Sequence, residues 1–397
     1  MYPAHGHGPE LAYGEWMKKQ EKESALQSSA GGAVRPALIA SRQTVFEYPT
    51  FLEHLLVGLA DESIPVALVC PPDSDIQSIM SGPVEIISYP AIRLPFMERP
   101  NRKRLVQQLS SFKPTVLHCL CEREAGSVKQ VAHQLGLPYV LTVNSLRTAG
   151  IRVSVSWRHC ARIIVPTTTV ANDFAGAYPR LAERITQINM GTFVEQDSTS
   201  FSEPSRLVSM VTASPLDHLG DFENLCGAVR HLTIGGYEFA LAIMGAGRAE
   251  RQLRKLLAAL DLSQTVTIVP MLRPWRAVLA GGDIFVQPRP SVTFNPFLLE
   301  AMSVGSAVAA CKGGVDDLIM EDRTAVVFDP RDELSIRSTL QRLLDRPEFA
   351  RQLARAAQRY LRANHSVSDM VSATVQTYRE AMEWHQRQEG VSASVGF

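Results

Sequence analysis

A stretch in the second half of the sequence combines residue types that bind anions. Asn295 and Pro296 favour the first turn of a helix, and the apolar run that follows them ends at Gly305. Strand-like segments, residues 283–287 and 307–311, lie on either side of this helix. The helix therefore begins beside the carboxyl end of a sheet, where free backbone N–H groups and the helix dipole favour a negatively charged ligand. The chemistry indicated is the binding of a phosphate or a similar anion.

Length and composition exclude several classes of protein. The 397 residues are enough for two domains, and 40 basic residues balance 40 acidic ones, so no nucleic-acid partner is indicated. The six cysteines show no CxxC spacing and are interpreted as reduced core thiols. No apolar run approaches the ~18 residues that span a bilayer, and charges interrupt the N-terminal segment where a signal peptide would be apolar. We expect a cytoplasmic protein without a metal site.

Strand and helix patterns alternate along the chain from residue 36 onward. The predicted strands of the first half are residues 37–40, 66–70, 84–87, 115–119, 139–143, 162–166 and 185–188. Those of the second half are residues 207–211, 239–244, 265–269, 283–287, 307–311 and 325–328. Such alternation predicts parallel, doubly wound sheets, and the polar segment 195–205 between the halves is a plausible linker. An amphipathic tail over residues 349–385, interrupted near 364–366, completes the pattern.

Several segments resemble, in order, those of GT-B glycosyltransferases, specifically glycosyltransferase family 4, the retaining group 1 type. The likeness extends over roughly residues 36–385 and rests on the ordered set of segments. The segments of the second half are residues 241–247 (strand then GxG), 282–288 (AD-strand-PS), 294–308 (FG-LEAMA-G-PV) and 313–319 (GG-PE-I). The looser matches of the first half are residues 115–119, 138–143 and 188–191.

The resemblance implies an α/β GT-B fold, in which two doubly wound Rossmann-like domains face a central cleft. The implied units are a flexible or helical arm (1–35), an acceptor-side domain (36–198), a nucleotide-sugar-side domain (206–362) and a helix that crosses back (363–397). A helix over residues 11–26 is one interpretation of the arm and disorder is the other.

The resemblance also implies a substrate class and donor-site residues. The donor would be a nucleoside-diphosphate sugar of the UDP or GDP type, the acceptor a glycan or glycoconjugate, and neither a cofactor nor a metal would be required. Glu300 would bind the ribose hydroxyls of the nucleotide. Further donor contacts would come from Gly245, Gly247, Asn295, Phe297 and Arg289.

Five features depart from the family pattern. Ser214 and Leu219 stand where the family has its phosphate-binding Arg and Lys. Val292 replaces the first of two glutamates, the second being Glu300, and Asn144 replaces a histidine. Residues 41–47 replace the glycine-rich loop that follows the first strand. The glycines that do match the family pattern are therefore also explained by the need for glycine in turns alone.

Other polar groups are candidates for the missing contacts. Arg289 precedes the donor helix, and an arginine at the carboxyl end of a strand can bind phosphate bidentately. The further candidates for phosphate or acceptor contacts are Arg42, Arg248, Arg273, Arg276, His118 and Asn144. The arginines are equally explained as solvated or ion-paired surface groups, and His118 as a hydrogen-bonded core residue.

Three functions are compatible with the sequence. The first is a retaining transferase of polysaccharide or glycoconjugate biosynthesis. The second is a degenerate pseudo-glycosyltransferase that acts as a binding or scaffolding module. The third is a dinucleotide-dependent oxidoreductase, which is disfavoured because the candidate fingerprint at residues 245–250 lacks its third glycine. Peripheral membrane contact, a homo-oligomer and a partner glycosyltransferase all stay open.

Overall fold

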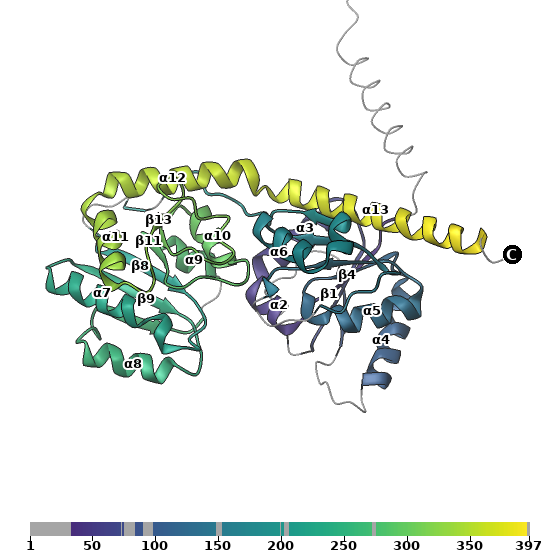
Figure 1. Cartoon of the computed structure of the whole chain (residues 1–397), viewed down its shortest axis with the longest axis horizontal. Coiled ribbons are helices and arrows are strands. Elements are labelled where there is room, and N and C mark those ends of the chain that lie inside the picture. Colours follow the sequence, from purple (N-terminus) through teal and green to yellow (C-terminus); the bar gives the residue numbers. More distant parts are fainter. Residues whose placement is uncertain are drawn as a thin grey trace, which may run out of the picture.

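The computed structural model describes residues 33–72, 74, 84–89, 98–147, 153–198, 200–201, 206–271 and 275–394. These residues form two α/β units that lie side by side, with two long helices running along one side of both (Figure 1). The predicted helix over residues 11–26 and the candidate Arg273 lie outside the described residues.

The first unit is built on a seven-stranded parallel sheet in the order β3-β2-β1-β4-β5-β6-β7. Its strands are β1 (Pro36–Ile39), β2 (Val66–Cys70), β3 (Val84–Ser88), β4 (Val116–Cys119), β5 (Tyr139–Thr142), β6 (Cys160–Val165) and β7 (Ile185–Gln187). Every residue of β1, β2, β4 and β5 is buried, as expected for strands covered on both faces. The helices of this unit are α2 (Arg42–Glu47), α3 (Pro49–Asp61), α4 (Glu98–Phe112), α5 (Ala125–Leu135) and α6 (Thr168–Ala177).

The second unit repeats this arrangement with a six-stranded parallel sheet in the order β10-β9-β8-β11-β12-β13. Its strands are β8 (Val208–Ala213), β9 (Phe239–Met244), β10 (Val266–Val269), β11 (Ile284–Gln287), β12 (Ala307–Ala310) and β13 (Val326–Val327). Its helices are α7 (Glu223–Ile234), α8 (Glu250–Ala259), α9 (Trp275–Ala280), α10 (Pro296–Ser303) and α11 (Glu333–Asp345). The predicted alternation and the two doubly wound parallel sheets are thus confirmed.

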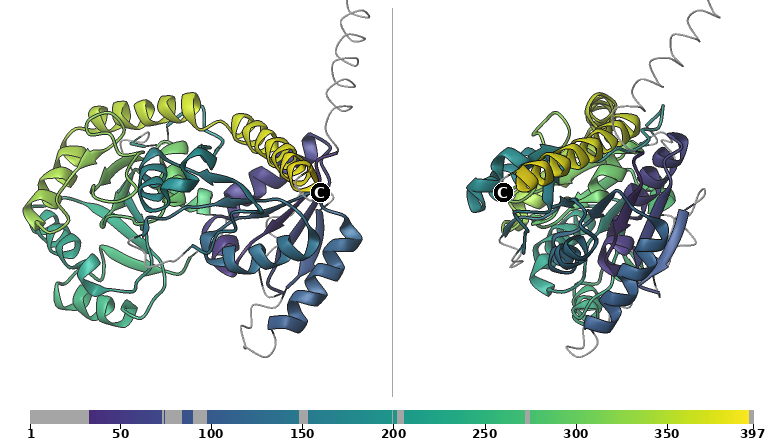
Figure 2. Two further views of the ribbon diagram at one scale, coloured as in Figure 1. Left: turned by 45° about the vertical axis from the view of Figure 1, so that its right-hand side comes forward. Right: turned by 90° about the vertical axis from the view of Figure 1, so that its right-hand side faces the viewer.

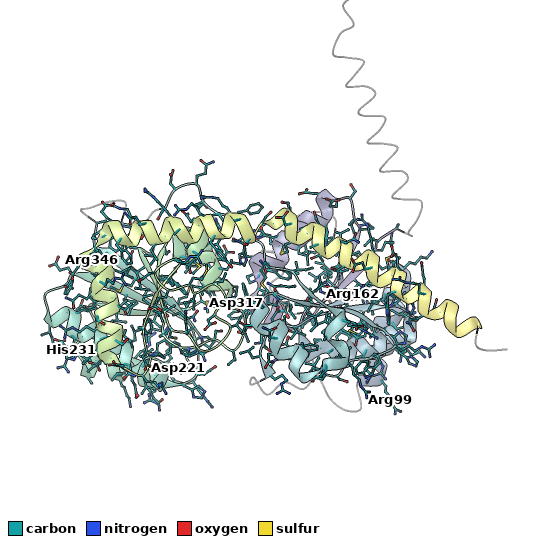
Figure 3. The ribbon with its side chains drawn as sticks, turned by 45° about the horizontal axis from the view of Figure 1, so that its top comes forward. Arg99, Arg162, Asp221, His231, Asp317 and Arg346 are labelled. Atoms are coloured by element: carbon teal, nitrogen blue, oxygen red, sulfur yellow. The ribbon has the colours of Figure 1, made fainter. Side chains whose placement is uncertain are left out.

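Helices α12 (Pro347–Asn364) and α13 (Val367–Ser394) tie the two units together. Helix α12 lies along the second unit and α13 lies across the first, on the face that also carries α3 (Figures 1 and 2). The apolar face of α13 joins the core of the first unit through Met370, Val371, Val375, Tyr378 and Met382. An ion pair between Arg162 of β6 and Glu380, with 3.1 Å between Nε and Oε2, lies beneath this helix (Figure 3).

The segment after β1 differs from the predicted loop. Residues Arg42–Glu47 form helix α2, because the Ser41 side chain accepts a hydrogen bond from the backbone N–H of Thr44 and so caps the helix. This segment lacks glycine, and Pro49 then starts α3. Arg42 is therefore the first residue of a helix and not part of an open loop.

Candidate functional site

The carboxyl ends of two neighbouring strands, β8 and β11, define the first candidate site. The strand order reverses between them, since β9 and β10 lie on one side of the pair and β12 and β13 on the other. Open parallel sheets bind ligands outside the strand ends at such a switch point. The loops that leave β8 and β11 there, residues 214–222 and 288–295, contain five of the residues that the resemblance singled out: Ser214, Leu219, Arg289, Val292 and Asn295.

Arg289 brings a positive charge to this switch point. Its Nε lies 3.2 Å from Oγ of Ser214 and 3.4 Å from Oδ2 of Asp221, which is labelled in Figure 3. The resemblance expects an arginine at position 214, where this chain has a serine. The Arg289 guanidinium, from the neighbouring loop, lies beside this serine. The Arg289 side chain is 37% exposed and that of Asp221 24% exposed, so solvent weakens their ion pair. The carboxylate therefore neutralises the guanidinium only in part.

The first turn of α10 has fewer free backbone N–H groups for an anion than the sequence predicts. Oδ1 of Asn295 accepts hydrogen bonds from the backbone N–H groups of Phe297 and Leu298, at 3.0 and 3.3 Å. Pro296 has no N–H to offer. Phe297 itself is buried, with its ring 4.4 Å from the ring of Trp275. An anion at this helix terminus would have to displace the Asn295 cap.

Glu300 is buried in an ion-paired cluster with Arg276. Its side chain is 4% exposed, and Oε1 accepts a hydrogen bond from Oγ1 of Thr192 at 2.9 Å. Oε2 accepts one from Nη1 of Arg276 at 2.8 Å and a longer one from Oγ of Ser303 at 3.4 Å. Burial raises the pKa of the Glu300 carboxyl, and the nearby Arg276 guanidinium opposes that rise. Arg276 also donates to the Glu195 carboxylate and to the Phe193 carbonyl. A ribose hydroxyl that contacts Glu300 would have to share the carboxylate oxygens with Thr192, Arg276 and Ser303.

The glycines of the GxG turn allow two loops to pack against each other. A Cβ atom at Gly245 would collide with the carbonyl oxygen of Ser214, and one at Gly247 would collide with that of Leu216. Arg248 continues the same contact, since its Nε donates to the Asp217 carbonyl oxygen at 3.0 Å. In this structure these three candidate residues position the loop after β8, which carries Ser214.

A short interdomain pairing, formed by residues 291–294 and residues 144–146, joins the two units; we call it the latch. The backbone N–H of Leu146 donates to the Val292 carbonyl at 2.8 Å, and that of Phe294 donates to the Asn144 carbonyl at 2.8 Å. The Tyr48 hydroxyl adds a bond to the Phe294 carbonyl at 3.0 Å. Val292, which stands where the family has a glutamate, is 41% exposed and contributes its backbone to the latch. Leu219, at the expected lysine position, begins a short 3-10 turn, Leu219–Asp221.

Arg42 lines a second candidate site, at the edge of the first sheet. A cavity of about 280 Å³ lies at the carboxyl ends of β1 and β2, beside the β1–β4 switch point of this sheet. Arg102 and Arg123 also line it, and Glu124 is the one carboxylate among its described lining residues. The three arginines come from α2, from α4 and from the turn before α5, a convergence that local sequence patterns do not show.

A buried carboxylate that the sequence reasoning missed lies close to the latch. Glu122 is 6% exposed and accepts hydrogen bonds from the Ser145 hydroxyl and, at 3.4 Å, from the Asn144 backbone N–H. The Asn144 side chain is also buried, and its Oδ1 has no hydrogen-bond partner among the described residues. The sequence contains one indication of this residue: Glu122 follows shortly after β4, at the sheet edge where ligands bind.

His118 lies in the core and not in a cleft. It is 1% exposed, its Nδ1 lies 2.7 Å from the Tyr378 hydroxyl, and its Nε2 lies 2.7 Å from Oγ1 of Thr142. Burial lowers its pKa to about 3, so the ring is neutral. Both ring nitrogens are bonded within the protein, which leaves none for the predicted acceptor contact.

The part of the chain that the structure describes contains neither a membrane-spanning helix nor a cluster of metal ligands. None of its helices is long and apolar enough to cross a membrane. In that same part, no three His, Cys, Asp or Glu side chains converge as ligands of a metal ion would.

Comparison with known proteins agrees with this architecture. Residues 217–346 match the family model described as "Glycosyl transferases group 1". The sulfoquinovosyl transferase SQD2 of Arabidopsis thaliana is 24% identical over 279 residues, which cover 64% of this chain and 54% of that protein. The alpha-D-kanosaminyltransferase of Streptomyces kanamyceticus is 28% identical over 156 residues, or 38% of this chain and 40% of that protein. The chain thus spans about half the length of these curated relatives.

Solved structures extend the likeness to most of the chain. Anabaena Alr3699/HepE in complex with UDP and glucose superposes with a TM-score of 0.73 at 14% identity, covering 87% of this chain and 99% of that one. A glycosyltransferase from Rickettsia africae ESF-5 gives a TM-score of 0.72 at 12% identity, covering 88% and 99%. At these identities the likeness shows the fold. Residues 217–346 thus match a group 1 glycosyl transferase model, and the two parallel sheets of the chain build the GT-B fold.

Proposed function

We propose that the chain binds a nucleoside-diphosphate sugar, of the UDP or GDP type, at the carboxyl edge of the second sheet. It transfers the sugar, with retention, to a glycan or glycoconjugate held on the side of the first sheet. The observation that carries this proposal is the position of Arg289 beside Ser214, because a diphosphate needs a cation at this switch point.

The remaining donors of Arg289 suit a phosphate. Its Nε is directed at Ser214 and Asp221, while its two Nη groups make no hydrogen bond with any residue that the structure describes. A guanidinium with free Nη groups can bind two phosphate oxygens in parallel. The partial ion pair with Asp221 holds the side chain over the strand ends without occupying those groups.

The relatives support the choice of ligand. The Anabaena protein of the same fold has been crystallised with UDP and with UDP-glucose. The curated relatives named above are a sulfoquinovosyl transferase and a kanosaminyltransferase, both of which are sugar transferases by name. The two curated names share sugar transfer, and the UDP-glucose of the Anabaena structure belongs to the donor class proposed for this chain.

Calorimetric titration with UDP, GDP and their common sugar conjugates tests the proposal. We expect the wild-type protein to bind one nucleotide with a Kd of roughly micromolar order. Arg289→Gln should weaken that binding at least about tenfold, since a charge-assisted hydrogen bond contributes roughly 1.5–3 kcal/mol. Arg251→Gln, which removes one exposed charge from α8, is the matched control and should leave the Kd unchanged. Folded wild-type protein that binds no nucleotide of the panel would contradict the proposal.

A second function is favoured by the contacts of Glu300 and by the latch. Both oxygens of the Glu300 carboxylate already accept hydrogen bonds within the protein, and residues 291–294 pair with the first unit. Both features suit a pseudo-glycosyltransferase that retains the fold in order to hold a partner glycosyltransferase or a second copy of itself. Nucleotide release from the sugar conjugate separates the two functions: steady turnover by the purified protein excludes the pseudoenzyme, and tight binding without turnover supports it.

A further inference from the structure

A hollow of about 700 Å³ lies on the flank of the first unit, between α4, α5 and residues 156–159. Four of its lining side chains carry a permanent positive charge, two more are histidines, and none of the described lining residues is a carboxylate. These six side chains are Arg99, Arg102, Lys129, Arg158, His133 and His159. Arg99, at the outer end of α4, marks this flank in Figure 3.

Within the part of the chain that the structure describes, no carboxylate neutralises the four permanent charges. Among the residues that the structure describes, no carboxylate forms an ion pair with any of them, although other arginines, such as Arg162 and Arg254, have such partners. Arg102 bonds instead to the neutral amide of Gln130, and its Nε is buried without a hydrogen-bond partner. Because the chain as a whole has equal numbers of acidic and basic residues, this is a local excess of positive charge.

His159 provides a second, independent observation: it is a buried side chain without hydrogen-bond partners among the described residues. The residue is 6% exposed, and neither of its ring nitrogens makes a hydrogen bond of normal geometry. Its pKa is lowered first by burial and then by the positive charges of His385, His133 and Arg158, while the nearby Leu137 carbonyl acts weakly in the opposite direction. A buried polar ring that lines a hollow of one charge sign, with both nitrogens unbonded, indicates a missing ligand.

We propose that this hollow binds a phosphate-bearing ligand, either the headgroup of an anionic lipid or a phosphorylated soluble compound. The guanidinium groups of Arg99 and Arg158 offer paired N–H donors that match phosphate oxygens, and Arg102 and Lys129 add positive charge. The site goes beyond the proposed donor site, because it lies in the other unit and requires no sugar transfer. Arg102 and Gln130 also line the 280 Å³ cavity at the edge of the first sheet, so the two hollows adjoin.

Two probes and two matched variants test this site. The probes are inorganic pyrophosphate, titrated by calorimetry, and phosphatidylcholine vesicles containing phosphatidylglycerol, followed by co-sedimentation. The test variant combines Arg99→Gln, Lys129→Gln and Arg158→Gln. The control variant removes the same number of charges from exposed positions of α8 and α12: Arg251→Gln, Lys255→Gln and Arg355→Gln.

We expect the full-length protein to bind at least one probe and the test variant to bind it about tenfold more weakly or worse, with the control variant within about twofold of wild type. Pyrophosphate binding identifies a soluble phosphate ligand, and vesicle binding alone identifies a lipid headgroup; either result supports the site. Arg289→Gln separates this site from the donor site, since pyrophosphate bound at the second sheet loses affinity in that variant. The proposal is overturned if neither probe binds, or if the test variant loses no more affinity than the control.

Discussion

The buried imidazole of His118 makes the stability of this fold depend on pH in a defined direction. Burial lowers its pKa from 6.5 to about 3 in the folded protein, whereas the unfolded chain keeps the ordinary value. Between these two values the unfolded state binds a proton that the folded state does not. The contribution of His118 to the free energy of unfolding therefore falls as the pH decreases from about 6.5 toward 3, and it is constant above that window.

The size of the effect follows from the same two values. At about pH 5 the solution is roughly 1.5 units below the unfolded pKa, and each unit corresponds to about 1.4 kcal/mol, so His118 lowers the free energy of unfolding by about 2 kcal/mol relative to pH 7.5. The substitution His118→Gln removes the titrating group but keeps a polar side chain between Thr142 and Tyr378. We expect it to lower stability at neutral pH by roughly 1–3 kcal/mol, because one buried partner is left without its bond.

The assay is urea unfolding of both proteins at the two pH values, followed by circular dichroism. The wild type should lose about 2 kcal/mol more than the variant on acidification. Three other histidines with lowered pKa values, His54, His159 and His365, titrate in both proteins, so their contributions cancel in the comparison. Equal losses in the two proteins would refute the assignment of a neutral, buried imidazole to His118.

Two further predictions concern the second unit. Arg276→Met leaves the buried Glu300 carboxylate without its cation and should lower the free energy of unfolding by roughly 2–4 kcal/mol, with much of the loss recovered in the double variant Arg276→Met, Glu300→Met. If the double variant is no more stable than the single one in urea, the carboxylate is not the source of the loss. Gly245→Ala forces a Cβ against the Ser214 carbonyl oxygen and should lower the free energy of unfolding by roughly 1–3 kcal/mol in the same assay. An unfolding midpoint equal to that of the wild type would contradict this prediction.

The sequence predicts the elements of this fold well because their signals are local. Buried parallel strands are short runs of apolar residues, and turn residues separate them from helices, so both sheets and the break between α12 and α13 were evident. Residues 41–47 are the exception: the absence of glycine predicts a changed loop, whereas the Ser41 cap makes the segment helical.

The candidate site was less predictable because its contacts join residues far apart in the chain. Arg289 and Ser214 are 75 residues apart, and Glu300 and Thr192 are 108 apart. The family resemblance made Glu300 a candidate, and its place before the donor helix made Arg289 one. Only the fold shows that Arg289 keeps Nη groups without a partner among the described residues, while both oxygens of Glu300 already accept hydrogen bonds. The partner of His118, Tyr378, lies 260 residues away on α13, which is why its core role could not be separated from an acceptor role by sequence alone.

Arg289 and the latch share one loop, residues 288–295, and this connects the two proposed functions. The latch bonds and the Tyr48 hydroxyl hold residues 292–294 against the first unit, which limits the movement of the backbone that carries Arg289. A cation held in place before the ligand arrives loses little conformational entropy on binding, so a fixed loop favours nucleotide affinity. The same restraint opposes the domain movements that accompany catalysis in many two-domain enzymes. The latch therefore favours binding over turnover, and so nucleotide binding and sugar transfer must be measured separately in this protein.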